Sequence, residues 1–384
     1  MIIDSSTCPP KFSLSHNVST THTTTNDDGA TPTDFRRARE LVLMYGWNTT
    51  CFQIVNPGIE YWFGGDGKSV VGYDTERGVR VVVGAPVAEE HGLADVTKSF
   101  ELDAANAGES VCYFGAEARL ERVLRDSKDH ARVLLGAQPV WHPAEWATTV
   151  AKNSSIRAQL NRARNKGVVI NEWTVEASRN NPQLHECLHL WLESKGLPPL
   201  HFVIEPETLD RLRNRRIFVA ERDGRVEAFL VLSPIPERAG WLTEQFPHRP
   251  GAPNGTVELM MDAAIRALAD DGYEYVTLGL SPLSRRATIE PFDNPIWLRL
   301  LLAWMRKHGQ RFYNFDGLDR FKNKLCPKYW EPIFAISNEA EFSGKTLYAI
   351  ALAFTENKPF RVLFQGLGKA IVAEARNFRR WLTK

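Results

Sequence analysis

The fold is decided near the C-terminal end, by the stretch Phe312-Tyr313-Asn314-Phe315-Asp316-Gly317-Leu318-Asp319-Arg320-Phe321-Lys322-Asn323-Lys324-Leu325-Cys326-Pro327-Lys328-Tyr329-Trp330-Glu331-Pro332. Alternating aromatic and polar residues predict a strand over 311–315, with Tyr313 and Asn314 at its end. Lys322 and Lys324 follow a Gly-Leu turn and share one side if that segment is extended. A buried core strand would not be expected to carry several lysines beside a Trp-Glu-Pro sequence. The lysines of this segment are therefore candidates for binding a ligand.

A second informative segment, Pro253-Asn254-Gly255-Thr256-Val257-Glu258, places a turn before a helix predicted over 258–270. Asn254 or Thr256 can cap that helix, which is the ordinary role of such residues. Free N–H groups at a helix start also hold anions or carbonyl oxygens, and Glu258 lies in the first turn.

A third segment ends the strand predicted over 275–280 with the residues Gly279-Leu280-Ser281-Pro282. Ser281 is either a substrate contact or a loop hydroxyl.

Five cations and no acidic residue lie between positions 152 and 166, on a helix predicted over 154–166. The cations are Lys152, Arg157, Arg162, Arg164 and Lys166. Arg157, Asn161 and Arg164 share a helix face, and guanidinium groups pair bidentately with phosphate oxygens. This face indicates either a solvated basic helix or an RNA-backbone site whose affinity falls steeply with salt.

Together these motifs resemble the C-terminal catalytic module of the lysylphosphatidylglycerol synthases, which move an amino acid from its tRNA to a lipid. The resemblance spans roughly residues 34–342 and is strongest over 152–167 and 250–336. It implies an α/β fold of two tandem acetyltransferase-like (GNAT-like) domains with mixed sheets, in a stand-alone soluble form. The multi-span half of the larger enzymes has no counterpart in this sequence, so lipid translocation is not expected.

The resemblance also implies a reaction, in which an acceptor hydroxyl attacks the ester carbonyl of an aminoacyl-tRNA. The acceptor expected is phosphatidylglycerol, another membrane lipid, or a small hydroxyl compound, and no cofactor or metal is implied. Because the ester is already activated, positioning and oxyanion stabilisation suffice. The catalytic candidates are Glu258, Asn254 and Tyr313, with Glu258 recognising the donor ammonium or acting as base. The substrate-binding candidates are Lys152, Arg157, Asn161, Arg162, Ser281, Asn314, Lys322 and Lys324.

The chain is expected to divide into four parts. Residues 1–33 hold too few large apolar groups to offset ordering entropy and are predicted to be a disordered tail. An N-terminal domain is predicted over 34–148 and a catalytic domain over 149–343. Within 344–384, the basic amphipathic pattern after residue 360 suits either an anionic membrane surface or a helix packed on the protein.

Composition narrows the class and location. The chain is 43% hydrophobic and 24% charged, with a net charge of +1, so an anionic partner must be met by local patches. No apolar run is long enough to span a membrane. Five scattered cysteines without a C-x-x-C pair favour a reducing compartment. We therefore expect a cytoplasmic protein, peripheral on the inner face of the cell membrane; the oligomeric state is not indicated.

Three other functions fit parts of the sequence. His185-Glu186-Cys187-Leu188-His189 matches the H-E-x-x-H pattern of zinc hydrolases, although the leucines of that helix place the histidines on its flank. An acyl-CoA-dependent N-acyltransferase would share the fold, but the R/Q-x-x-G-x-G/A loop that holds coenzyme A is missing. A non-catalytic RNA- or membrane-binding protein would need only the basic segments.

Overall fold

The computed structural model describes residues 32–194, 201–287, 294, 296, 297, 299 and 315–355 of the 384-residue chain. The predicted N-terminal tail and the basic helix after residue 360 therefore lie outside the described residues. So do Tyr313 and Asn314. The sequence also predicts a helix over 297–308, and most of that range lies outside the described residues.

The N-terminal elements alternate strands with helices. They are α1 (Pro32–Tyr45), β1 (Glu60–Phe63), β2 (Val70–Glu76), β3 (Val79–Val83), α2 (Leu93–Asn106), β4 (Ser110–Ala116), α3 (Ala118–Leu124) and β5 (Ala131–Trp141). The valine-rich runs form β2 and β3 because β-branched side chains suit a pleated buried surface, and every residue of β3 is buried. The sequence predicts strands over 61–63, 69–73, 79–84, 111–114 and 132–135. Strands β1 to β5 confirm them, whereas α2 was not predicted.

The following elements form the second part of the fold. They are α4 (Trp146–Lys152), α5 (Ser154–Arg164), β6 (Val169–Trp173), α6 (Val175–Ser178), α7 (Pro182–Glu193), β7 (Arg216–Arg222), β8 (Arg225–Ile235), β9 (Gly240–Gln245), α8 (Thr256–Asp270), β10 (Tyr275–Thr277), β11 (Ser281–Pro282), α10 (Phe315–Lys324), β12 (Tyr329–Ser337) and α11 (Gly344–Thr355). The sequence predicts strands over 168–173, 217–220, 228–232 and 275–280 and helices over 154–166, 184–194 and 258–270. Elements β6, β7, β8, β10, α5, α7 and α8 confirm them, whereas β9 was not predicted.

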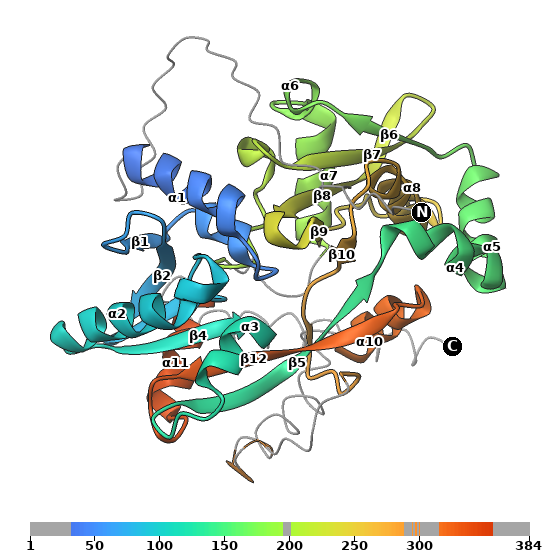
Figure 1. The fold of residues 1–384 in the computed structure, drawn as a ribbon. Helices are drawn as coiled ribbons and strands as arrows, with labels where there is room; N and C mark the ends of the chain where they lie inside the picture. The colour runs from blue at the N-terminus through green and yellow to red at the C-terminus, as the bar shows by residue number, and fades with distance from the viewer. Residues whose placement is uncertain are drawn as a thin grey trace, which may run out of the picture.

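A single mixed sheet connects both parts within the described residues. Its order is β1-β2-β3-β4-β12-β5-β10-β9-β8-β7-β6, with β11 beside β5. The pairs β3–β4 and β9–β10 are parallel, while the remaining pairs are antiparallel. Figure 1 shows β5, β10 and β12 running between the blue-to-cyan elements and the green-to-yellow ones. The α/β class is confirmed, and the division into two tandem domains stays a prediction.

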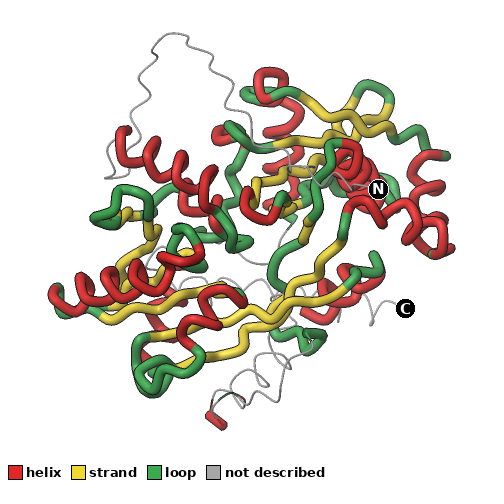
Figure 2. Tube along the Cα trace, in the orientation of Figure 1, coloured by secondary structure: helices red, strands yellow, loops and turns green. Residues whose placement is uncertain are grey.

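Helices cover the sheet where its strands are apolar. Helix α8 packs on β7 and β8 and against α5, and α11 packs on β2 and β3. Figure 2 shows these helices in red around the yellow strands. Among the described residues, no helix combines the length and the apolar character that crossing a bilayer requires.

Helix α10 corrects the extended basic segment that the sequence predicted. Phe321 and Leu325 stand four residues apart and both pack into the apolar cluster around α8, which is helical spacing. Successive residues on a helix are rotated by about 100°, so residues two apart point to different sides. Lys322 is therefore buried, while Lys324 reaches the partly exposed surface.

Candidate active site

A group of buried polar side chains lies where β5 runs between β12 and β10; we call it the seam cluster. Nε2 of Gln138 lies 3.0 Å from Thr49 Oγ1, 3.1 Å from Glu117 Oε2, 3.1 Å from the Tyr275 hydroxyl and 2.9 Å from Glu331 Oε2. The sheet register explains the meeting, because Gln138 stands opposite Glu331. An amide nitrogen carries two hydrogens, so these four oxygens share two donors.

Arg238 completes the seam cluster by joining its two carboxylates. Its Nη1 lies 2.9 Å from Glu117 Oε2, and its Nη2 donates to Glu331 Oε1. The guanidinium also lies 3.7 Å from the centre of the Tyr275 ring and 4.7 Å from that of Trp47. Stacking and ion pairing together fix the orientation of this arginine.

The seam cluster changes the acidity of its members. Burial raises the pKa of Glu117 to about 7; Arg238 opposes that rise and the Glu331 carboxylate adds to it. Burial also raises the pKa of Tyr275 well above its ordinary value. The side chain of Glu117 is 3% exposed and that of Glu331 is 22% exposed, so Glu331 is the more accessible of the two carboxylates.

Lys322 reaches from α10 into the chain that follows β10. Its ammonium donates to the carbonyl oxygens of Leu278, Gly279 and Leu280 at 2.7, 2.8 and 2.9 Å. Burial lowers the pKa of Lys322 to about 7, and Asp319 opposes that shift. An ammonium has three hydrogens, and all three are taken by carbonyls, so this geometry leaves none for a phosphate.

Glu258 and Lys324, both selected from the sequence, form an ion pair. Lys324 Nζ lies 3.2 Å from Glu258 Oε1, and the Glu258 side chain is 12% exposed. Asn254 is exposed beside them in the turn before α8. Gly255 has a φ of +95°, and a Cβ there would lie 2.2 Å from the carbonyl oxygen of Gln159 in α5. This close approach needs glycine and sets α5 against the start of α8.

The basic residues of α5 and its approach are exposed, as a phosphate-binding surface requires. The exposed residues are Lys152, Arg157, Asn161, Arg162 and Arg164. Arg157 also donates to the carbonyl oxygens of Val150 and Ala151 at the end of α4, and Arg164 pairs with buried Asp262 at 3.0 Å. Lys152, Asn161 and Arg162 make no such tie to another helix or strand among the described residues.

Ser281 is buried on β11, opposite Ala137 of β5. Among the described residues its hydroxyl has no hydrogen-bond partner, which is uncommon for a buried polar atom. The β5 residue that Ser281 pairs with, Ala137, directly precedes Gln138 of the seam cluster.

The H-E-x-x-H pattern on α7 serves other contacts. Glu186 accepts a hydrogen bond from Arg249 at 2.7 Å, and His189 lies 3.5 Å from Glu193. No group of three His, Cys, Asp or Glu side chains within the described part of the chain is placed to hold a metal ion.

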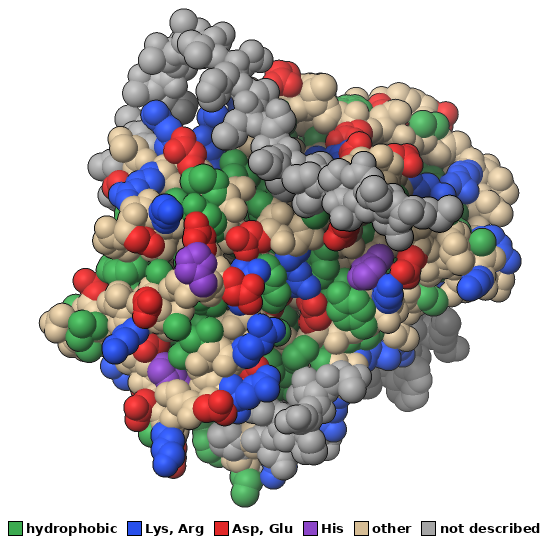
Figure 3. Space-filling model, in the orientation of Figure 1, with side chains coloured by type: hydrophobic (Ala, Val, Ile, Leu, Met, Phe, Trp, Pro, Cys, Tyr) green, Lys and Arg blue, Asp and Glu red, His purple; other side chains and the backbone are tan. Residues whose placement is uncertain are grey.

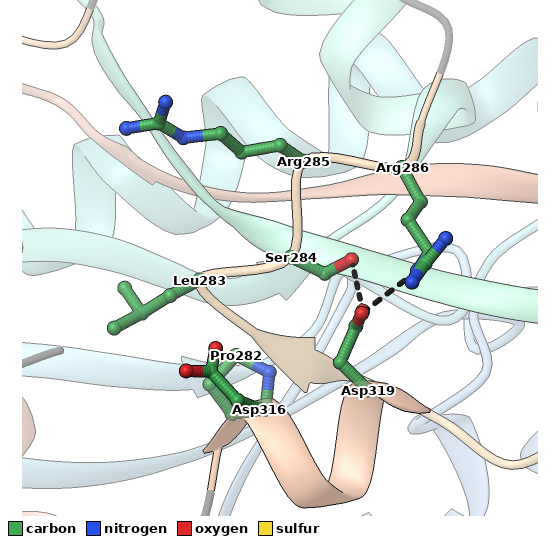
Figure 4. A pocket seen from close by; sticks show the side chains of 7 residues that line it. All are labelled: Pro282, Leu283, Ser284, Arg285, Arg286, Asp316 and Asp319. Carbon is green, nitrogen blue, oxygen red and sulfur yellow. Dashed lines mark hydrogen bonds and ion pairs between the residues drawn. The ribbon is translucent and has the colours of Figure 1, made fainter. Parts of the chain in front are cut away.

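A cavity of about 240 Å³ opens between the turn after β11 and helix α10. Its lining residues are Pro282, Leu283, Ser284, Arg285, Arg286, Asp316 and Asp319. Figure 4 shows Ser284 and Arg286 both reaching Asp319, with Asp316 on the same helix below them. On the face shown in Figure 3, acidic and basic side chains alternate, in keeping with the net charge of +1.

Sequence comparison identifies the family. The family model described as "Phosphatidylglycerol lysyltransferase, C-terminal" matches residues 39–337, which include the whole seam cluster. The chain belongs to this family. The phosphatidylglycerol lysyltransferase of Bacillus subtilis (strain 168) is 21% identical over 276 residues, covering 70% of this chain and 31% of that protein. The chain thus spans about a third of the length of that relative.

Two solved structures share the fold. One, from Agrobacterium fabrum, is described as the C-terminal domain (DUF2156) of a lysylphosphatidylglycerol synthetase; its TM-score is 0.70 at 20% identity, covering 85% of this chain and 98% of that one. The other is L-PGS from Bacillus licheniformis, with a TM-score of 0.69 at 18% identity, covering 85% and 96%. The family resemblance seen in the sequence is confirmed.

Sequence reasoning missed most of the seam cluster. Thr49, Glu117, Gln138 and Arg238 are isolated polar residues far apart in the chain, whereas Glu331 lies in the segment first selected for binding. The available signal was the Trp-Glu-Pro sequence beside a strand.

Proposed function

We propose that this protein transfers an amino acid from aminoacyl-tRNA to a hydroxyl group of phosphatidylglycerol or another membrane lipid. The observation that carries the proposal is the family match over residues 39–337. The buried charges where β5, β10 and β12 meet support it, because a preorganised polar site stabilises charge that develops during acyl transfer.

In the proposed reaction the acceptor oxygen attacks the ester carbonyl carbon and forms the new ester bond. The bond from that carbon to the ribose oxygen of the tRNA breaks. The proton of the acceptor hydroxyl passes to a carboxylate and then to the departing ribose oxygen, so atoms and charge balance. Glu258 is assigned as this carboxylate or as the partner of the donor ammonium, with Lys324 orienting it at 3.2 Å.

The exposed basic surface around α5 would bind the phosphates of the tRNA acceptor arm. Lys152, Asn161 and Arg162 present donors without an inter-element partner among the described residues, and Arg157 combines exposure with its contact to α4. Tyr313 and Asn314 are retained as contacts of the aminoacyl group on sequence grounds alone.

The proposal also covers the division of the chain into domains and its location in the cell. The continuous sheet would comprise two tandem GNAT-like units, 34–148 and 149–343, and distinct apolar clusters around α2 and around α8 support that division. Residues 360–384 would hold the protein on the inner face of the cell membrane through basic and apolar side chains.

A transfer assay tests the function. Purified protein is incubated with tRNA charged with labelled amino acids and with phosphatidylglycerol vesicles, with and without ribonuclease. Ribonuclease-sensitive label in the lipid is the expected result. Label that depends on acyl-CoA, or no label together with tRNA deacylation no faster than in buffer, would contradict the proposal.

Glu258→Gln separates its two possible roles, since it keeps the shape and removes the charge. A raised KM for aminoacyl-tRNA with little change in kcat indicates ammonium recognition, and a loss of kcat indicates the base. Unchanged turnover removes Glu258 from the site. Glu193→Gln, which changes an exposed glutamate at the end of α7, serves as the matched control.

A further inference from the structure

The turn that follows β11 is held rigidly by two elements. Ser284 N–H donates to Ser281 C=O at 3.2 Å, and Leu283 N–H donates to Leu135 C=O at 2.8 Å. A Cβ at Gly136 would lie 2.2 Å from the Ser281 carbonyl oxygen, so β5 and the turn are in close contact. From the other side, Asp319 of α10 accepts hydrogen bonds from Ser284 Oγ and Arg286 Nε, both at 2.7 Å.

This turn also carries backbone strain. Leu283 has a φ of +61°, in the left-handed region that is unfavourable for a bulky residue. Such strain persists where the surroundings enforce it, and it gathers at binding and catalytic sites. The enforced conformation places Arg285 and Arg286 in succession on the wall of the 240 Å³ cavity.

The two arginines of the cavity differ in their contacts. Arg286 is tied through Nε to Asp319 and lies over the Trp330 ring at 5.6 Å. Arg285 is exposed and makes no hydrogen bond or ion pair with the described residues, and Figure 4 shows its guanidinium directed away from Asp319. The wall therefore offers one oriented guanidinium and one that pairs with no described residue, with the Asp316 carboxylate across the cavity.

We propose that this cavity binds the phosphodiester headgroup of the lipid acceptor, with Arg285 and Arg286 on the phosphate and Asp316 on the headgroup hydroxyls. The inference rests on the proposed function and assigns its acceptor subsite. Guanidinium forks match phosphate oxygens, and a carboxylate accepts hydrogen bonds from hydroxyl groups. Drug-sized ligand pockets measure roughly 300–1,000 Å³, so a cavity of 240 Å³ suits a small headgroup.

Charge favours a lipid headgroup over the RNA backbone. The four charged lining residues sum to zero, two arginines against two aspartates, whereas RNA-backbone sites carry excess positive charge. Along β12, Trp330 beneath Arg286 is next to Glu331 of the seam cluster, and the two side chains point to opposite faces of the sheet.

Calorimetric titration of the full chain with glycerophosphoglycerol, the deacylated headgroup, tests the inference. Arg285→Gln is expected to weaken binding by about tenfold or more, the usual effect of losing one charge-assisted contact. Arg122→Gln, which removes an exposed arginine from α3, should leave the affinity unchanged. Arg286→Gln should act as Arg285→Gln does; if it fails to fold, Arg285→Gln still decides.

Several outcomes would overturn the inference. These are equal affinity for inorganic phosphate, unaltered headgroup binding in Arg285→Gln, and loss of tRNA binding rather than headgroup binding. Phosphatidylcholine vesicles with and without phosphatidylglycerol extend the test to the lipid itself. Arginine-dependent headgroup binding without aminoacyl transfer would support the subsite and reject the tRNA donor. Aminoacyl transfer by Arg285→Gln with an unchanged KM for lipid would support the tRNA donor and reject the subsite.

Discussion

Replacing Lys322 with methionine tests how α10 holds the chain after β10. Lys322 is 3% exposed, and its amine donates to three consecutive carbonyl oxygens at 2.7–2.9 Å. Methionine keeps a similar length and volume but donates nothing, so the carbonyls of 278–280 lose their donor. Each unsatisfied buried acceptor costs about 1–3 kcal/mol, partly offset because an ammonium no longer has to be buried. We expect a net destabilisation of a few kcal/mol.

The dependence on pH sharpens this prediction. The unfolded chain keeps the Lys322 proton up to a pKa near 10.5, whereas burial lowers the folded pKa to about 7. Between those values the unfolded state binds more protons, so folding stability rises with pH. Relative to Lys322→Met, the wild type should therefore gain up to about 1.4 kcal/mol per pH unit above pH 7 and lose that gain as the pH falls back through 7.

Urea denaturation followed by tryptophan fluorescence, from about pH 6 to about pH 9, measures this difference. Lys324→Met controls for loss of a lysine from the same helix. A difference between wild type and Lys322→Met that stays constant over this range would refute the reasoning. It would mean that the three carbonyls outweigh burial and keep the amine charged.

Three further predictions follow from the contacts described. Gly255→Ala should lower the free energy of unfolding by more than about 2 kcal/mol in a thermal melt, because the new Cβ would lie 2.2 Å from the Gln159 carbonyl oxygen. Gly58→Ala is the control for backbone strain, because Gly58 also has a positive φ but has open space around it. Burial raises the folded pKa of Glu117 to about 7. The wild type should therefore lose stability relative to Glu117→Gln as the pH rises from about 5 to 7, by up to about 1.4 kcal/mol per pH unit. A difference in unfolding free energy that does not change over this range would contradict the prediction. His189→Ala should leave transfer activity and metal content unchanged, and a loss of bound zinc would revive the hydrolase alternative.

The sequence predicted correctly those helices and strands whose side-chain periodicity lies within a single segment. The alternating and valine-rich runs gave β2, β3, β7 and β8, because side-chain period and β-branching act locally. Helix α2 carried a comparable signal, with Leu93, Val96, Phe100 and Ala104 at helical spacing, and could have been predicted. Helix α10 was missed because Gly317 and Pro327 indicate loop boundaries, although Phe321 and Leu325 have helical spacing.

The seam cluster could not be derived from local patterns. Its members come together only because β12 inserts between β4 and β5, and β10 pairs with the other edge of β5. Nothing near Gln138 or Arg238 in the sequence specifies that strand order. Glu258 and Lys324 were both selected from their segments, but their ion pair depends on α10 being a helix.

The charge balance of the seam cluster follows from its geometry. Arg238 faces two carboxylates, and burial makes full ionisation of both unfavourable, which is why the pKa of Glu117 rises to about 7. Glu117 is enclosed, whereas Glu331 is the more accessible of the two carboxylates. A positive charge placed near Glu331 would favour the ionised form of Glu117, because the two acids share one arginine and one amide.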